Sequence, residues 1–360
     1  MRITAIRLRR VARELDPPFA AAWDPVPRRR FEATIVVVET DEGLTGFGSG
    51  DTMDGFGAYE HLFVGRDPLD VQHHARVLET IAFHAGRYWP LEAALWDLLG
   101  KARGEPVATL LGGAVNRLPL YASTGAIRPP GERAELALRL RDEGFRALKI
   151  RVEPEGLEEG VASVAAVRHA VGDTMEIMVD LNQAWRMPGD VREPLPYKTV
   201  RGLADALDAH GVRWLEEPLP GEDVAGLAQL RRESGVPVAG GEMARTPALL
   251  DAYLEADALD VYQPDAVLAV GVTRARNLGR RVLERGLAFT PHTWTNGIGL
   301  LANLHLSAGI GGGPYLEFPY DPPGWTPERR DFMLAEPIVP DADGCLAVPA
   351  APGLGVELDG

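Results

Sequence analysis

The feature that most constrains this fold is a regular alternation of β-rich runs and amphipathic helical stretches between residues 118 and 319. The β-rich runs are 118–124, 147–152, 176–182, 213–218, 237–242, 259–265, 287–293 and 315–319. Eight such units are what a TIM-type (β/α)₈ barrel needs. An open doubly wound sheet is the alternative, but it usually shows a glycine-rich fingerprint after its first strand, and YASTGAIRPP contains no G-x-G-x-x-G.

The N-terminal third of the chain follows a different pattern. Short β-rich runs with tight turns, TAIRLRRV and FEATIVVVETDEG, precede a helical region from His61 to about Leu111, in which Gly104 ends one clear helix. We therefore expect an α+β capping domain at 1–113 and the barrel at 114–324. The Pro-rich segment 325–360 contains one strand-like run, GCLAVP, and is expected to pack back on the capping domain.

Composition restricts where this chain works and what it binds. The 360 residues are 46% apolar and 25% charged, which is typical of a soluble globular protein. The single Cys345, the absence of a signal-like N-terminus and the absence of a long apolar window predict a cytoplasmic protein without membrane contact. A net charge of −15 disfavours a nucleic-acid partner, and we interpret the run Arg28 to Arg30 as a solvated strand entry. An anionic substrate would require locally placed positive charge.

Charged or titratable residues lie at the C-terminal ends of seven consecutive predicted strands. They are Lys149 and Arg151, Asp180 (followed by Asn182), Glu216 and Glu217, Glu242, Asp265, His292, and Glu317. A barrel brings these strand ends together around one small space, which is where active sites of such barrels are built. One such residue alone would more often be a cap or a surface group. All seven strands together predict a single functional site.

Three of these residues predict a metal site. Asp180, Glu216 and Glu242 come from adjacent strands, and three carboxylates do not share a pocket as anions without a compensating cation. Hard oxygen ligands with room for water and substrate suit Mg²⁺, with Mn²⁺ as a possible substitute. The alternative is that the three carboxylates cap helices or pair with arginines.

The other strand-end residues predict acid–base chemistry beside that metal. Asp265 would orient His292 and raise its basicity, which makes His292 a general base poised near neutral pH. Lys149 and Arg151, two apart on one strand, would form a cationic opposite wall. Glu317, between apolar neighbours, would stay protonated and donate a hydrogen bond to a developing oxyanion. This set suits removal of the proton next to a carboxylate and stabilisation of the resulting enediolate.

These motifs resemble those of the enolase superfamily, mandelate racemase subgroup. The resemblance covers nearly the whole chain: ALWDLLGKARGEPVATLLGG joins the two domains, and VDLNQAW, WLEEP, GGE, QPD, PHTW and YLEFP follow in that order. It implies a modified, enolase-like barrel whose capping domain is completed by the C-terminal tail, Mg²⁺-dependent chemistry, and Glu216 rather than Glu217 as the ligand. Since barrels of this family commonly assemble, it also implies a homo-oligomer.

Two departures from the family pattern narrow the reaction. Racemases of this subgroup carry Lys-x-Lys on the second strand, whereas this chain has Lys149-Ile150-Arg151. Arginine stays protonated at ordinary pH, so Arg151 is a clamp rather than a base, and His292 remains the only convincing base. Muconate-lactonising and dipeptide-epimerising relatives place a lysine at the end of strand six, where this chain offers Leu268. Those activities are therefore disfavoured.

One base beside a metal predicts β-elimination of water from a sugar acid, the reaction of an acid-sugar dehydratase that forms a 2-keto-3-deoxy acid. The alternatives are a sugar-acid lactone cycloisomerase, a racemase or epimerase of a 2-hydroxy acid with Lys149 as second base, and a binding protein without catalysis. Residues expected to contact the substrate are Asn182, Trp23, Trp185, Trp294, Thr293 and Asn296.

Overall fold

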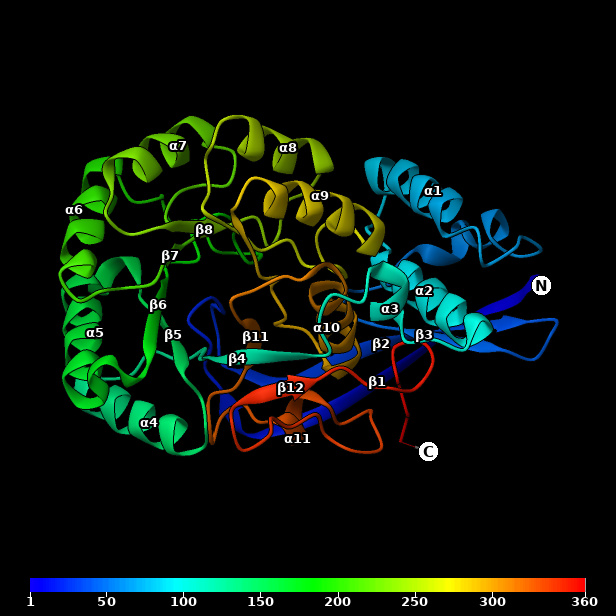
Figure 1. The fold of residues 1–360 in the computed structure, drawn as a ribbon, viewed down its shortest axis with the longest axis horizontal. Coiled ribbons are helices and arrows are strands. Elements are labelled where there is room, and N and C mark those ends of the chain that lie inside the picture. Colours follow the sequence, from blue (N-terminus) through cyan, green and yellow to red (C-terminus); the bar gives the residue numbers. More distant parts are fainter. Residues whose placement is uncertain (360) are drawn as a thin grey trace.

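The computed structural model describes residues 1–359 and begins with a small antiparallel sheet (Figure 1). Its strands β1 (Ile3–Phe19), β2 (Arg28–Thr40) and β3 (Thr45–Gly48) pair in the order β1-β2-β3. Helices α1 (Val71–His84), α2 (Trp89–Arg103) and α3 (Val107–Leu111) follow. The α2 helix packs so closely on β3 that a Cβ at Gly48 would overlap the Pro90 carbonyl. As predicted, α2 ends at Gly104, whose φ of 69° is the left-handed conformation that glycine adopts without strain.

Eight parallel strands then curl around a common interior. They are β4 (Arg117–Ser123), β5 (Ala147–Arg151), β6 (Glu176–Asp180), β7 (Leu215–Glu216), β8 (Val238–Gly240), β9 (Val261–Tyr262), β10 (Ala288–Phe289) and β11 (Leu316–Pro319). The helices between them are α4 (Pro130–Asp142), α5 (Leu157–Val171), α6 (Tyr197–Asp208), α7 (Val224–Glu233), α8 (Pro247–Glu255), α9 (Val272–Glu284) and α10 (Gly297–Ile310). Short 3₁₀ turns lie at Phe56–Ala58, Glu60–Leu62, Pro154–Gly156 and Gly172–Thr174.

The strand order β10-β9-β8-β7-β6-β5-β4-β11 confirms the predicted (β/α)₈ architecture, and each of the eight predicted runs overlaps one of these strands. Helices α4 to α9 form the outer layer around the curled sheet (Figure 1). The two end strands meet through two hydrogen bonds, from Thr290 Oγ1 to the Tyr315 carbonyl at 2.6 Å and from Gly313 N to the Phe289 carbonyl at 2.9 Å. Within residues 1–359, no helix combines the length and the apolar character needed to cross a membrane.

The lower interior of the curled sheet is an apolar layer with one residue from each strand or its flank. Its buried members are Tyr121, Ala147, Met178, Trp214, Ala239 and Val261, with Ala288 and Tyr315 packed against them. The layer combines large and small side chains, and the rings of Tyr121 and Trp214 meet edge to face at 5.6 Å. Because strand side chains alternate with a period of two, the residue two positions further along each strand faces the same interior, one layer higher.

The C-terminal segment corrects part of one expectation. After α11 (Pro327–Arg330), the strand β12 (Cys345–Ala347) pairs antiparallel with β4 of the barrel, not with the capping sheet. The first residues of β4 extend beyond the paired residues of its neighbours β5 and β11. The backbone groups of these first residues would otherwise lack partners, and β12 supplies hydrogen bonds to them. Further on, the tail does contact the N-terminal helices, since Leu354 N donates to Asp97 Oδ1 at 2.7 Å and Val107 N donates to the Gly353 carbonyl at 2.9 Å.

Candidate active site

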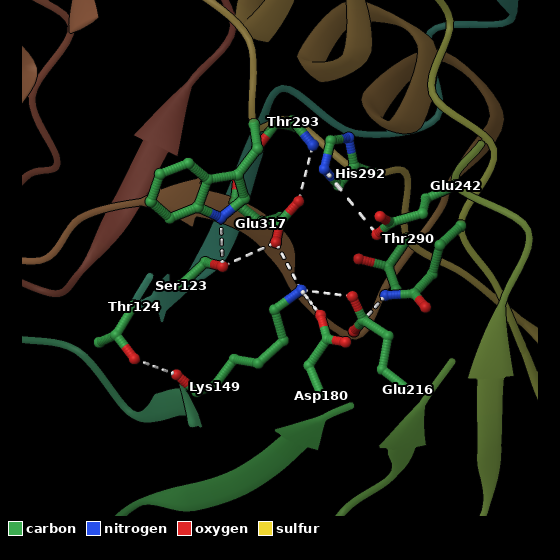
Figure 2. Close-up of polar contacts among 12 residues, drawn as sticks. Ser123, Thr124, Lys149, Asp180, Glu216, Glu242, Thr290, His292, Thr293 and Glu317 are labelled. Atoms are coloured by element: carbon green, nitrogen blue, oxygen red, sulfur yellow. Dashed lines mark hydrogen bonds and ion pairs between the residues drawn. The ribbon is translucent and has the colours of Figure 1, made fainter. Parts of the chain in front are cut away.

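The layer directly above the apolar one is polar. Two positions after each apolar residue come Ser123, Lys149, Asp180, Glu216, Gly241, Gln263, Thr290 and Glu317. Figure 2 shows the side chains of most of them converging at the carboxyl ends of the strands. The same two-residue period that builds the barrel core thus places a ring of polar side chains above it.

Two of the three predicted metal ligands, Asp180 and Glu216, belong to this layer, and Glu242, which follows Gly241, lies beside them. Asp180, Glu216 and Glu242 each offer an oxygen, and these oxygens lie within 4.8 Å of one another in a buried setting (Figure 2). Burial and the charges of neighbouring carboxylates raise the pKa of Glu216 well above its ordinary value, although Lys149 opposes this. Within residues 1–359, Glu242 Oε2 has no hydrogen-bond partner, while Oε1 accepts from Trp185 Nε1 at 2.8 Å. Crowded hard oxygens with one free donor atom fit a divalent cation such as Mg²⁺.

Glu217 is excluded from this cluster, in agreement with the choice of Glu216 as ligand. Its φ of 46° turns the backbone, and its buried carboxylate lines a separate cavity of about 400 Å³. Trp185 and Met243 border both that cavity and the one above the cluster, so they separate the two.

His292 and Asp265 form the predicted pair. The distance from His292 Nδ1 to Asp265 Oδ2 is 2.9 Å, and His292 Nε2 lies 3.8 Å from Glu242 Oε2. Burial disfavours the imidazolium, but the charges of Glu242, Glu317 and Asp265 outweigh it and raise the pKa of His292 to about 9. This value is higher than the near-neutral one expected from the sequence, because His292 faces several carboxylates at once. A divalent cation on Glu242 would offset the first of these charges.

The opposite wall consists of two fixed cations. Lys149 Nζ lies 3.2 Å from Asp180 Oδ2 and 2.7 Å from Glu317 Oε1, and also contacts Glu216. Burial and the charge of Arg151 oppose its protonation, but these carboxylates outweigh both and raise the pKa of Lys149. Lys149 is therefore held as an ammonium, which argues against a role as second base.

Arg151 is held still more rigidly. Its Nη1 contacts Asp180 and donates to Asn182 Oδ1 at 3.0 Å, and its Nε donates to the Thr124 carbonyl at 2.9 Å. The guanidinium also lies over the ring of Trp23 at 4.7 Å. A guanidinium stays protonated at ordinary pH, so Arg151 can donate hydrogen bonds to an anionic group but does not accept a proton.

Glu317 differs from its predicted state. Its Oε1 accepts from Ser123 Oγ at 2.7 Å, and its Oε2 accepts from Thr293 N at 2.7 Å (Figure 2). The Ser123 hydroxyl itself accepts from Trp294 Nε1, so its proton points to Glu317. Burial opposes ionisation, but the charges of Lys149, His292 and Arg151 prevail and lower the pKa of Glu317 to about 2. Glu317 is an ionised acceptor, not the neutral donor that its apolar sequence neighbours suggested.

A cavity of about 280 Å³ lies above the carboxylate cluster, between the barrel and the capping domain. Four of the predicted substrate contacts line it, namely Trp23, Asn182, Trp185 and Trp294, together with Arg151, Glu242 and His292. Gly50 and Asp51, from the loop after β3, line it as well, as do residues that the sequence reasoning missed or read otherwise: Arg28, Phe31, Met187, Met243, Leu268, Thr295 and Trp325. Arg28 belongs to the run interpreted as a solvated strand entry, and only the fold brings it to the cavity, where it also binds Asp24 at 2.8 Å.

Thr293 and Asn296 do not line this cavity, contrary to expectation. Thr293 is buried and bonded through its backbone N and its Oγ1 to Glu317. Asn296 caps α10, accepting from Ile298 N at 3.1 Å, and its Nδ2 donates to Ser49 Oγ at 2.8 Å. The polar atoms of both side chains are engaged in hydrogen bonds with backbone groups or buried side chains, so these side chains have a structural role.

Comparison with known proteins identifies the family. The family model described as mandelate racemase / muconate lactonizing enzyme, N-terminal domain, matches residues 3–112, and the one described as enolase C-terminal domain-like matches residues 132–360. The chain belongs to the enolase superfamily. Within it, the chain belongs to the mandelate racemase and muconate lactonizing enzyme family, and its relatives there include both lyases and isomerases.

Its relatives in this superfamily include two sugar-acid enzymes. The chain is 29% identical to D-galactarolactone cycloisomerase of Agrobacterium fabrum, over 100% of this chain and 97% of the relative. It is 29% identical to D-galactonate dehydratase of Ralstonia nicotianae, over 89% of this chain and 87% of the relative. The crystal structure of a racemase from Streptomyces coelicolor with bound magnesium superposes with a TM-score of 0.83 at 27% identity, over 99% of this chain and 97% of the other.

Proposed function

We propose that this protein is a Mg²⁺-dependent lyase that removes the α-proton of a sugar acid and then eliminates water from the neighbouring carbon. The product would be a 2-keto-3-deoxy acid. The observation that carries the proposal is the asymmetry of the site. A single buried histidine, paired with Asp265, faces the carboxylate cluster from one side, while Lys149 and Arg151 on the other side are held protonated.

Asp180, Glu216 and Glu242 would hold the Mg²⁺ ion, with Mn²⁺ as a substitute. When bound, the ion would supply positive charge beside the substrate carboxylate, where negative charge accumulates during proton removal. Lys149 adds a second positive charge that the chain itself provides.

The residues of this chain account for the removal of the α-proton and for the protonation of the leaving oxygen. His292 Nε2 takes the α-proton, while Asp265 fixes the ring through Nδ1. The bond between the β-carbon and its hydroxyl oxygen then breaks, and protonated His292 donates its proton to that oxygen, which leaves as water. The resulting enol becomes the 2-keto acid. Arg151 and Asn182, which both line the cavity, would hold the substrate carboxylate or a hydroxyl.

A second candidate is the cycloisomerase reaction, in which the departing oxygen is part of a lactone ring and no water is lost. The aromatic side chains that line the cavity favour it: Trp23, Phe31, Trp185, Trp294 and Trp325 supply apolar surface against which a sugar ring can pack. The cycloisomerase relative that matches the full chain supports it too. Racemisation is less favoured, since it needs a second base and Lys149 is held as an ammonium.

The test is a screen of sugar acids and their lactones, with Mg²⁺ or with EDTA, that detects 2-keto acids with a carbonyl reagent. Mass spectrometry of the product separates the two candidates, because dehydration loses one water and ring opening of a lactone does not. His292→Asn should abolish the signal, whereas His169→Asn, which changes an exposed histidine on α5, should leave it unchanged.

Two results would count against the lyase proposal. If no acid forms a keto product but α-deuterium exchange occurs in ²H₂O, the reaction is a racemisation. If neither occurs and Mg²⁺ does not change the melting temperature, the chain is a binding protein on this fold.

A further inference from the structure

The side chain of Asp265 is anchored by more than its histidine. Its Oδ2 faces His292 Nδ1 at 2.9 Å, and its Oδ1 accepts from Val267 N at 2.8 Å and Leu268 N at 3.3 Å. The remaining contact is with Asn303 on α10, whose Nδ2 donates to Asp265 Oδ1 at 3.0 Å. All these groups are buried.

Asn303 differs from the two backbone donors in its origin. Val267 and Leu268 follow Asp265 in the chain, so their N–H groups move with it. Within residues 1–359, Asn303 and His292 are the only residues outside that segment that hydrogen-bond the Asp265 carboxylate. Asn303 lies on α10, so its hydrogen bond fixes the Asp265 carboxylate relative to that helix and not only to its own segment.

The amide of Asn303 has only one orientation that satisfies its neighbours. Its Oδ1 accepts from Ala266 N at 2.9 Å, and its Nδ2 also lies 3.2 Å from the Gly299 carbonyl. If the amide were turned over, an oxygen would face two other oxygens and an NH₂ group would face an N–H. This hydrogen-bonding pattern thus orients the NH₂ group of Asn303 toward the Asp265 carboxylate, and its amide oxygen holds the backbone at Ala266 in place.

We propose that Asn303 is a positioning residue for the base: it holds Asp265 in the orientation that keeps the Nδ1 side of His292 bonded and leaves Nε2 facing the cavity. Asn303 does not line the cavity and so acts only through Asp265. The role of His292 as base rests on the proposed function, whereas the effect of Asn303 on the His292 hydrogen bond does not.

Two variants separate the donor from the shape of this side chain. Asn303→Leu removes both the donor and the acceptor at a similar side-chain volume. Asn303→Asp keeps the shape and the acceptor for Ala266 N but sets a second carboxyl group against Asp265, where it either repels that carboxylate or shares a proton with it. We expect each to lower kcat by about tenfold or more with KM changed less than about threefold. The control is Ser307→Ala, one turn further along α10, whose buried hydroxyl has no hydrogen-bond partner in the described chain. It should leave both constants within about twofold.

A second readout needs no substrate. In ¹⁵N-histidine-labelled protein, the signal of the His292 Nδ1 proton is assigned by its loss in His292→Asn. We expect that signal to shift or disappear in Asn303→Asp and Asn303→Leu, while the signal of His74, buried on α1, stays in place.

The outcomes are distinct. An unchanged His292 signal in a folded Asn303→Leu protein, or wild-type kcat in that variant, overturns the proposal. If no substrate is ever turned over but the signal changes as expected, the proposed function fails and the positioning of His292 by Asn303 stands.

Discussion

Replacing Glu92 by glutamine should change how the stability of this protein depends on pH. Glu92 lies on α2 and is fully buried at the contact with α9. Its Oε1 accepts from Thr273 N, in the first turn of α9, at 2.8 Å, and its Oε2 has no partner in the described chain. Burial outweighs these hydrogen bonds and raises the pKa of Glu92 from 4.5 to about 7.

The sign and size of the effect follow from that shift. Since the folded protein binds the proton more tightly than the unfolded chain, this group contributes stability below about pH 4.5, which is lost as the pH rises through 7. The change corresponds to about 3 kcal/mol. A glutamine side chain does not titrate, so Glu92→Gln should gain about 3 kcal/mol of unfolding free energy relative to wild type between about pH 4.5 and pH 8.

The assay is urea unfolding of both proteins at several pH values, compared as the difference between them. Glu284→Gln, an exposed carboxylate at the other end of α9, is the control and should show no such trend. Parallel pH profiles of wild type and Glu92→Gln would refute the reasoning, because they would mean that Glu92 has the same affinity for its proton in both states.

The remaining predictions concern a second buried group and the active site. Burial lowers the pKa of His305 from 6.5 to about 4, so the stability from its neutral form is complete above 6.5 and is lost as the pH falls through 4. Urea unfolding should therefore show that acidification from about pH 7 to 4 costs wild type about 3 kcal/mol more than His305→Gln. Mg²⁺ at about 100 times its Kd should stabilise wild type by about 3 kcal/mol in a thermal melt, and Glu216→Gln should lose this effect. Lysine, unlike arginine, can lose its proton and act as a base. Arg151→Lys should therefore lower the main activity and introduce exchange with ²H₂O of the α-proton of the substrate's epimer, which wild type does not exchange. Proton NMR would detect this exchange.

Much of the fold and most of the proposed site were predictable because both depend on short-range regularity. The alternation of runs with periods of two and about 3.6 residues located all eight barrel strands. Residues at the ends of parallel strands must converge, so Asp180, Glu216 and Glu242 were expected together before any contact was known, and they lie together. The pairing of Asp265 with His292 on the neighbouring strand followed from the same argument.

The sequence did not determine which groups each polar side chain contacts, and these contacts decided the chemistry of several residues. Glu317 looked neutral beside Leu316 and Phe318, yet those neighbours point away while Lys149, Ser123 and Thr293 approach it from other strands and loops. A hydrogen bond depends on atoms placed within about 3 Å by distant parts of the chain, and no sequence period encodes that placement. For the same reason, only the tertiary structure brought Arg28 to the cavity, β12 to β4, and Asn303 to Asp265.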